Sequence, residues 1–491
     1  MNPDRLPGLL LAAVLLIVMS FVGFQTDADS DLWGNVRFGQ DILAARSIPE
    51  KDPYSFTSDR RWVNHEWLAE VLFAVAYDSA GSAGLIGLRW ALVAGMYLVV
   101  WRSLRRAGVF RPLAVGLLLV TSAGTYAQLV MVRPQLFSVF FFALLLALMN
   151  GVARGRTRLV FWVPALFAVW ANLHGGWIVG AGILGLWSAC SAAAGSITWR
   201  TAAAGIVLAL LGSLATPYGL ELWRLLWDTV GIGRADIAEW DPLVRWPAQF
   251  VGWGLTVSLL VVVWRRHARA ATLWLLPALA MGLLAFRVVR LEGFFTLATV
   301  ILLAPWFAGL GPQRLPLSRP PTCAELAAVG SLCLVGVVGV EFAVLRNAGC
   351  IAIEGPGRVF RSAPEAEAIT FLRDNPIQGR LLTYFDYGHM AIWHLAPKLR
   401  VSYDGRRETV YSEAVQKAHL RFYAGTPDAG YAAALKADYI WLPLRLPVVG
   451  ELKRVGWVEI FRGPRSVVFA QEEGPYAQPA PWTGPRCFPG P

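Results

Sequence analysis

The sequence predicts a polytopic α-helical membrane protein of about 11 spans, with a soluble α/β domain at its C-terminus. Hydrophobic residues make up 56% of the 491 residues, only 16% are charged, and the mean hydropathy is +0.49. Soluble globular domains do not have this composition. The formal net charge of +11 comes mainly from arginines. Their distribution indicates membrane topology, and it argues against nucleic acid as a partner.

Apolar runs bounded by arginines or polar loops mark the candidate spans. They cover residues 8–24, 83–101, 112–130, 135–150, 159–173, 176–195, 202–216, 250–264, 271–286, 293–310 and 325–345. The first run has no small-residue cleavage site after it, so we expect an uncleaved span. The half-apolar run 67–77 is bounded by charged residues, and we interpret it as a helix in the membrane interface rather than another span.

The arginines orient these spans. If the N-terminus is cytoplasmic, every short loop on that side carries at least one arginine, as the positive-inside rule requires; examples are Arg102, Arg154 and Arg265. The acidic first loop 25–82, the loop 217–249 and the chain after about residue 346 then lie on the outer side. We therefore predict three parts: a transmembrane domain over 1–345, an outer α/β domain over 346–475 and a proline-rich tail over 476–491.

The acidic first loop opens with Asp27, Asp29 and Asp31 at alternate positions, directly after the first apolar run. In an extended segment these three side chains point the same way. Behind them a short helix is predicted, with one apolar face and a position flat in the headgroup layer; the apolar face consists of Leu32, Trp33, Val36 and Leu43.

A carboxylate at the membrane surface can act as a general base. We assign that role to Asp29, whereas Asp31 has two interpretations, catalysis and N-cap of the helix that begins near Leu32. A divalent metal is a second way to use these carboxylates. Its ligands would be Asp29 and Asp31 with a histidine, His174 or His65.

Several basic residues lie at the outer ends of predicted spans, against the positive-inside rule. They are Arg133, Arg287 and Arg290, with Arg89 about 9 Å below the outer face. Snorkelling or salt bridges between helices would account for any one of them. Together they form an outer cationic set, for which a phosphate or pyrophosphate group is the natural ligand.

Other outer-face residues are candidates for substrate binding. His65 and Glu66 precede the half-apolar run, Asn172 and His174 lie in a tight turn with paired glycines, and Glu239 and Trp240 lie in an aromatic, acidic loop. Aromatic rings among carboxylates suit sugar binding, but they also suit an interfacial aromatic belt. His174 has the alternative of a helix-end residue that bonds a carbonyl.

The C-terminal domain alternates strands and helices. Strands are expected at 380–385, 399–403, 438–442 and 466–470, and helices at 390–395, 413–423 and 430–436. A further helix should begin at the capping box Ser362-Ala-Pro-Glu365 and end before Pro376. The sheet should be partly parallel. Asp404-Gly405-Arg406 lies at the end of a strand, where a turn and a ligand contact are both reasonable. The tail should be loosely ordered.

Cys350 and Cys487 are the two cysteines on the predicted outer side, and they bracket the α/β domain. A disulfide between them would tie the tail to the last span, and the alternative is two unpaired thiols.

These features together resemble the GT-C glycosyltransferases of bacterial membranes. The resemblance rests on the loop layout and on short motifs: Asp29-x-Asp31-Leu-Trp, Ile48-Pro-x-x-Asp52-Pro, Trp62-x-x-His65-Glu66-Trp, Arg133-Pro-Gln, Trp170-Ala-Asn-Leu-His174-Gly-Gly and Glu239-Trp. It differs in one respect, because many members have adjacent Asp-Glu where this chain has alternating aspartates.

The resemblance implies a multi-pass enzyme of the bacterial inner membrane. It would transfer a sugar from a polyprenyl-phosphate donor to a lipid, glycan or protein acceptor on the outer face. Two alternatives remain: a transporter or flippase for lipid-linked glycans, and a non-catalytic subunit of an envelope-polysaccharide machine. The sequence contains no internal repeat, and apart from Arg89 its charges stay near the membrane faces, which argues against a transporter.

Overall fold

The computed structural model describes residues 13–14, 16–18, 27–229, 237–310, 322–347, 349–353, 364–425 and 430–491. The chain forms two compact units. Unit 1 comprises Met1–Gln25, Ile86–Leu220 and Gly233–Gly349, and unit 2 comprises Thr26–Leu85, Glu221–Ile232 and Cys350–Pro491. The acidic first loop and the C-terminal domain, which are far apart in the sequence, therefore belong to the same unit.

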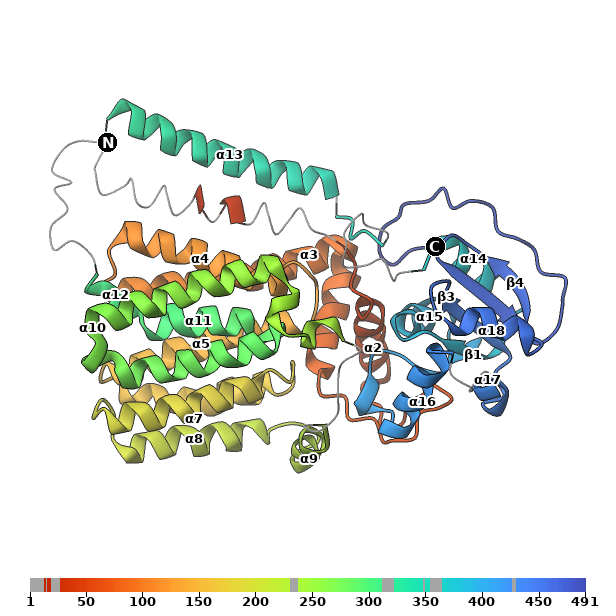
Figure 1. The fold of residues 1–491 in the computed structure, drawn as a ribbon, viewed down its shortest axis with the longest axis horizontal. Helices are drawn as coiled ribbons and strands as arrows, with labels where there is room; N and C mark the ends of the chain where they lie inside the picture. The colour runs from red at the N-terminus through yellow and green to blue at the C-terminus, as the bar shows by residue number, and fades with distance from the viewer. Residues whose placement is uncertain are drawn as a thin grey trace. The chain divides into compact units, whose positions relative to one another are not determined.

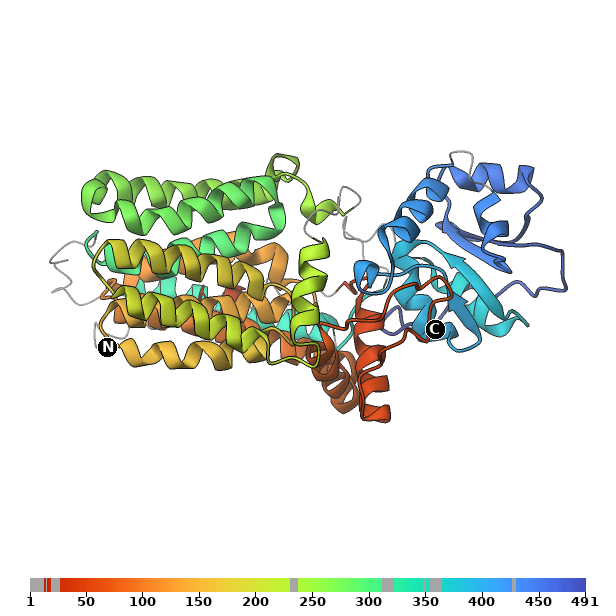
Figure 2. The same ribbon diagram turned by 90° about the horizontal axis from the view of Figure 1, so that it is seen from below.

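Unit 1 is a helix bundle, and its main helices lie side by side in Figures 1 and 2. Its helices are the second part of α3 (Trp67–Arg106), then α4 (Arg111–Leu129), α5 (Gln135–Ala153), η2 (Thr157–Trp162), α6 (Val163–Trp170), α7 (Trp177–Ala193), α8 (Trp199–Ser213), η3 (Ala238–Trp240), η4 (Leu243–Arg245), α10 (Pro247–Arg287), η5 (Val289–Leu291), α11 (Glu292–Leu302), α12 (Ala304–Ala308) and α13 (Cys323–Asn347).

Each predicted span from residue 83 onward coincides with helix in the structure. By length and composition, four of the described helices are long and apolar enough to cross a membrane. Of the predicted first span, residues 13–14 and 16–18 are helical, and the rest lies outside the described residues. A Cβ placed on Gly336 of α13 would lie 2.7 Å from the Cβ of Leu16, so these two segments pack closely.

The centre of unit 1 is α11, which is buried along its whole length. It packs against α4, α5 and α10. Within the predicted span 293–310 the helix is interrupted at Leu303, because α11 ends at Leu302 and α12 begins at Ala304 with Pro305 in its first turn. Proline has no N–H to continue the helical hydrogen bonds and is favoured in a first turn.

Two of the predicted spans, 250–264 and 271–286, are joined without a loop. Both belong to α10, which has one non-helical residue, His267 (φ −135°). The predicted connection at 265–269 therefore contains the break between two helices, but it is tighter than a loop, because only His267 leaves the helical conformation.

Unit 2 contains a five-stranded sheet in the order β2-β1-β3-β5-β4. The strands are β1 (Gly379–Thr383), β2 (Leu399–Val401), β3 (Tyr439–Pro443), β4 (Val458–Arg462) and β5 (Ser466–Ala470). β1 is parallel to β2 and β3, and β5 is antiparallel to β3 and β4. The sheet is therefore partly parallel. β4 was not predicted, because this short edge strand has a charged residue at its second and last positions.

Helices cover both faces of this sheet. They are α14 (Ala366–Asp374), η7 (Phe385–Tyr387), α15 (Gly388–Leu395), η8 (Arg407–Thr409), α16 (Glu413–Tyr423), α17 (Tyr431–Ala434) and α18 (Val448–Arg454). Successive strand residues point to opposite faces. Ile440 and Leu442 join the core made with α16, α17 and α18, whereas the ring of Trp441 lies 4.8 Å from that of Tyr387, next to α15.

The short helix predicted after the aspartates is α2 (Leu32–Ala45), which belongs to unit 2. Most of α9 (Leu220–Thr229) belongs to the same unit. Three residues of the predicted apolar face, Leu32, Trp33 and Val36, are buried, but the buried surface of α2 extends beyond that face. Leu43 is 42% exposed, whereas Gly34, Phe38 and Gly39 on the other sides are buried. The two glycines explain the difference, because they let neighbouring segments approach the helix closely.

These close approaches are specific. A Cβ on Gly34 would lie 2.6 Å from Cγ of His389 in α15, and one on Gly39 would lie 2.0 Å from the carbonyl oxygen of Glu70. Glu70 is in the first part of α3, the predicted second interfacial helix. This part is separated from the rest of α3 by a kink at Ala80 and Gly81, where φ is −152° and +56°.

The structure pairs Cys350 with Cys487, with their Cα atoms 5.2 Å apart. Residues next to this disulfide form a small set of backbone bridges, in which Ala352 pairs with both Asp27 and Cys487. The carbonyl of Pro489 accepts a hydrogen bond from Trp33 Nε1 at 2.7 Å. The expectation of a loosely ordered tail is therefore wrong at its end, where a disulfide and hydrogen bonds fix the chain.

Loss of the disulfide is expected to be visible in a gel. Oxidised wild-type protein should migrate faster without reductant than with it, because the bond closes a large loop, and Cys350→Ser should abolish the difference. Cys190→Ser is the control, because Cys190 is buried and unpaired. Alkylation of both Cys350 and Cys487 in oxidised, unfolded protein would contradict the pairing.

Candidate functional site

Asp29 and Asp31 of the acidic loop differ in burial and in their contacts. Asp29 is 2% exposed, and its Oδ1 accepts a hydrogen bond from the backbone N–H of Asp31 at 2.8 Å. The side chain of Asp31 is 33% exposed. Asp31 occupies the N-cap position of α2, but its side chain makes no capping hydrogen bond. The capping interpretation of its carboxylate is therefore wrong.

The carboxylate of Asp31 faces a histidine of the C-terminal domain instead. Nδ1 of His389 lies 3.2 Å from Asp31 Oδ1, and Nε2 of the same ring lies 3.4 Å from Asp404 Oδ1. His389 is the second residue of α15, and Asp404 follows β2. Both ring nitrogens therefore face carboxylates.

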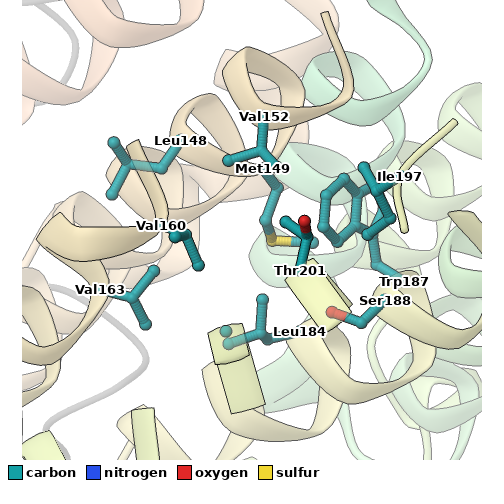
Figure 3. Close-up of a pocket in the computed structure, with 11 residues that line it drawn as sticks. Leu148, Met149, Val152, Val160, Val163, Leu184, Trp187, Ser188, Ile197 and Thr201 are labelled. Atoms are coloured by element: carbon teal, nitrogen blue, oxygen red, sulfur yellow. The ribbon is translucent and has the colours of Figure 1, made fainter. Parts of the chain in front are cut away.

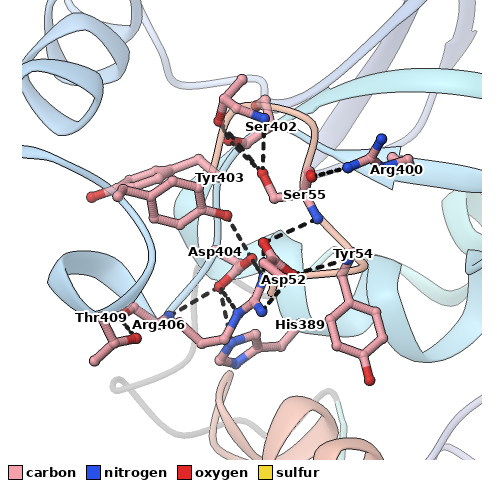
Figure 4. Close-up of polar contacts among 12 residues, drawn as sticks. Asp52, Tyr54, Ser55, His389, Arg400, Ser402, Tyr403, Asp404, Arg406 and Thr409 are labelled. Carbon is pink, nitrogen blue, oxygen red and sulfur yellow. Dashed lines mark hydrogen bonds and ion pairs between the residues drawn. The ribbon is translucent and has the colours of Figure 1, made fainter. Parts of the chain in front are cut away.

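Asp404 continues the contacts inward to an arginine (Figure 4). Arg406 donates to both Asp404 oxygens at 2.9 and 2.7 Å, and it forms a bidentate pair with Asp52 at 2.7 and 3.0 Å. Tyr411 also donates to Asp404, at 2.7 Å. The guanidinium lies over the rings of Phe38, Tyr54 and Trp62, with its carbon 4.7–5.3 Å from their centroids. Such stacking suits arginine but not lysine.

The charges in this network determine its protonation. Burial disfavours the charged form of His389, but Asp31 and Asp404 outweigh it and raise the pKa of the imidazole to about 9. Burial also disfavours ionised Asp404, yet Arg406 and His389 hold the pKa of that carboxyl well below its usual range. At neutral pH His389 is therefore a cation and Asp404 an anion, and Asp404 lies between His389 and the guanidinium of Arg406.

A second polar cluster lies in unit 1. Arg133 forms an ion pair with Glu239, and Nη1 of Arg290 lies 3.6 Å from the other Glu239 oxygen. Arg290 Nη2 lies 3.3 Å from Nε2 of His174, whose Nδ1 contacts Ser138 Oγ at 2.6 Å and the N–H of Gly176 at 3.0 Å. Four residues selected from the sequence thus come together: two of the arginines, His174 and Glu239.

Arg287 and Arg89 are the other two predicted phosphate ligands, and they differ in exposure. Arg287 is exposed at the last residue of α10. Arg89 is 1% exposed, and its Nη1 donates to the carbonyl of Val130. Asn172 donates to the carbonyls of Ala168 and Ala215, at 2.7 and 2.9 Å, so it fixes the turn before His174. Trp240 in η3 is 36% exposed.

His65 and Glu66 contact each other at 3.5 Å in unit 2. Among the described residues, no three histidine, cysteine or carboxylate side chains lie close enough to hold a metal ion. The metal predicted at Asp29, Asp31 and His174 thus stays a prediction from sequence. In unit 1 a small pocket lies between α5, α7 and α8, but its walls are almost wholly apolar (Figure 3). Its lining includes the hydroxyls of Ser188 and Thr201 but no charged side chain.

Asp52, Asp404 and Arg406 lie in short sequence motifs, but no pattern in the sequence connects them with one another or with His389. Asp52 lies within the motif Ile48-Pro-x-x-Asp52-Pro, and Asp404-Gly405-Arg406 follows a strand. No spacing links either motif to Asp31, because the contact is made by folding the C-terminal domain onto the first loop within unit 2.

Comparison with solved structures identifies the class of fold. The chain is similar to ArnT from Cupriavidus metallidurans, solved with undecaprenyl phosphate and also in the apo state (TM-score 0.57, 14% identity, covering 94% of this chain and 97% of that chain). It is also similar to the Archaeoglobus fulgidus oligosaccharyltransferase tethered with an acceptor peptide (TM-score 0.53, 12% identity, covering 88% and 69%).

The chain therefore has the GT-C fold, as the resemblance in its sequence predicts. It is mostly helical, with several apolar helices and a small C-terminal sheet. The sequence itself matches no protein-family model and no curated protein.

Proposed function

We propose that this protein is a membrane glycosyltransferase that transfers a sugar from a polyprenyl-phosphate donor to an acceptor lipid, glycan or protein on the outer face of the membrane. The observation that carries the proposal is a pair of carboxylates, Asp29 and Asp31, placed directly after the first apolar run of a GT-C fold. One of them would take the proton from the acceptor hydroxyl as it attacks the anomeric carbon.

Negative charge builds up on the departing phosphate in the same reaction, and cations must stabilise it. Arg133 and Arg290 in unit 1 supply such cations, with His174 beside them. Their present partner is the carboxylate of Glu239, an anion with the geometry that a guanidinium binds. Undecaprenyl phosphate in the ArnT structure supports a lipid-linked phosphate as the ligand of this fold.

The Cys350–Cys487 disulfide supports an oxidising location for unit 2, because structural disulfides persist in the periplasm and outside cells. It agrees with the arginine distribution, which puts the N-terminus in the cytoplasm and the acidic loop on the outer face. Both favour the bacterial inner membrane, with the α/β domain periplasmic or extracellular.

The proposal is tested by profiling the glycans and glycolipids of a deletion strain. We expect one glycosylated species to disappear, its unglycosylated acceptor to accumulate, and the wild-type gene to restore it. An accumulated lipid-linked glycan on the inner leaflet would instead favour a flippase. Unchanged profiles would contradict the glycosyltransferase proposal.

Removal of the arginines is expected to weaken donor-lipid binding. A charge-assisted contact contributes about 1.5–3 kcal/mol, so Arg133→Ala and Arg290→Ala should each weaken binding of undecaprenyl phosphate by tens-fold. Lysine at either position should restore only part of the affinity for undecaprenyl phosphate, because an ammonium cannot bind two phosphate oxygens as a guanidinium does. The measurement is native mass spectrometry or a thermal shift with that lipid.

Arg287 provides the matched comparison for this experiment. The sequence groups it with the other two arginines, but it is exposed at the end of α10. We expect Arg287→Ala to bind undecaprenyl phosphate more like wild type than the other two variants do. Unchanged affinity in Arg133→Ala and Arg290→Ala would mean that these residues only form salt bridges to Glu239.

A further inference from the structure

We propose that His389 is a positioning residue for Asp31, and that the C-terminal α/β domain thereby completes the active loop; this inference rests on the proposed function. In this arrangement Asp31, rather than Asp29, is the carboxylate that meets the acceptor. His389 orients it through Oδ1, and Asp404 holds the imidazole from behind.

The first argument is exposure. Asp29 is 2% exposed, and its Oδ1 accepts the N–H of Asp31, so it shapes the loop. The side chain of Asp31 is 33% exposed and can be reached from outside. A general base must come within hydrogen-bonding distance of the hydroxyl that it deprotonates. Of these two carboxylates, Asp31 is the one that offers exposed surface to such a hydroxyl.

The second argument is the fit around His389. Three glycines surround the Asp31–His389–Asp404 row, and each leaves room that a side chain would fill. A Cβ on Gly34 would lie 2.6 Å from the imidazole, one on Gly388 would lie 2.4 Å from the Cβ of Asp404, and one on Gly405 would lie 2.2 Å from Asp31 Oδ1. The ring of Phe38 meets the imidazole edge-on, with centroids 5.4 Å apart. The imidazole therefore has little freedom to turn away from Asp31.

The third argument is the anchoring of Asp404. Its side chain is fully buried, and it accepts hydrogen bonds from Arg406 and Tyr411 as well as facing His389. Arg406 is in turn held by Asp52 of the acidic first loop. A chain of paired charges thus runs from the domain interior to the exposed carboxylate. Outer-shell partners of this kind fix the orientation of an acting group, and their loss typically costs 10–100-fold in activity.

The test is a double-mutant cycle in the full-length protein, expressed in the deletion strain. The readout is the amount of the missing glycosylated species formed by membranes, normalised to the amount of protein. We expect His389→Gln to reduce it by at least about tenfold. Because His389 acts through Asp31, Asp31→Asn/His389→Gln should be no worse than Asp31→Asn alone.

Two further variants separate positioning from folding. Gly34→Ala keeps every charge and is compatible with a helix, but its methyl group should push the imidazole away from Asp31 and lower product formation as His389→Gln does. Gly450→Ala in α18 is the control, because a Cβ there meets nothing within 4 Å. His394→Gln is a second control on α15, since His394 bonds the carbonyl of Pro489.

The outcomes are distinct. Normal product formation by His389→Gln and Gly34→Ala, with strong loss in Asp31→Asn, would overturn the positioning role and leave the proposed function intact. If the losses of the two single variants, Asp31→Asn and His389→Gln, multiply in the double variant, the positioning role is also overturned. Full activity of both Asp29→Asn and Asp31→Asn would instead show that neither carboxylate is the base. That result would contradict both the base in the proposed function and the positioning role of His389.

Discussion

Removal of the base carboxylate from the acidic loop is expected to reduce sugar transfer by roughly 10²–10⁴-fold, the usual contribution of general base catalysis. The two candidates are Asp29, which the sequence favours, and Asp31, which the exposure and the contact with His389 favour. Asparagine has the shape of aspartate without its basicity. Asn at position 29 can still accept the N–H of residue 31, so the loop should keep its form.

The measurement is formation of the glycosylated species by membranes that contain equal amounts of each variant. We expect the large loss in Asp31→Asn and a smaller one in Asp29→Asn. A larger loss in Asp29→Asn than in Asp31→Asn would indicate that Asp29 is the base. Near-normal transfer by both well-expressed variants would exclude a carboxylate of this loop as the base.

Much of the fold could be predicted because the signals are local. Long apolar runs bounded by arginines locate the helices of unit 1 from residue 83 onward. In the C-terminal domain α16 begins and ends where it was predicted, at Glu413 and Tyr423. Ser412 before it accepts the N–H of Val415, as an N-cap serine does.

The wrong predictions concern residues whose burial or order depends on packing between distant segments of the chain. Gly34 and Gly39 of α2 have no side chain, so a pattern of apolar residues does not mark their positions as buried. The same glycines allow His389 and the backbone of Glu70 to cover them. The tail was expected to be loose because it is rich in proline, but the disulfide and the bond from Trp33 to Pro489 fix its end.

For the candidate site, too, the sequence indicates single residues but not the contacts between distant segments. Asp29, Asp31 and the outer arginines could be selected from the sequence, since charges next to apolar runs are costly and stand out. Glu239 and His174 were also selected, but not the ion pairs that join the cluster. The link from Asp31 to His389 had no signal in spacing, because the contact depends on where the C-terminal domain folds within unit 2.

Replacement of Arg406 by methionine is expected to destabilise unit 2 by about 3–5 kcal/mol, because it takes the guanidinium away from buried Asp52 and leaves buried Asp404 with His389 alone. The side chains of Asp52 and Asp404 are fully buried, and that of Arg406 is 5% exposed. Methionine fills much of the same volume under the rings of Phe38, Tyr54 and Trp62, so the loss reports the charge more than the packing.

Pulse proteolysis of the full-length protein in detergent and increasing urea, with detection of the C-terminus, measures the effect. The matched control is Arg454→Met, since Arg454 pairs with Glu451 on the surface with 77% of its side chain exposed. Exposed pairs contribute about 0–1 kcal/mol. The triple variant Asp52→Asn/Asp404→Asn/Arg406→Met removes the stranded charges and should recover part of the loss. If Arg406→Met and Arg454→Met unfold at the same urea concentration, the buried network does not hold the acidic loop to the C-terminal domain.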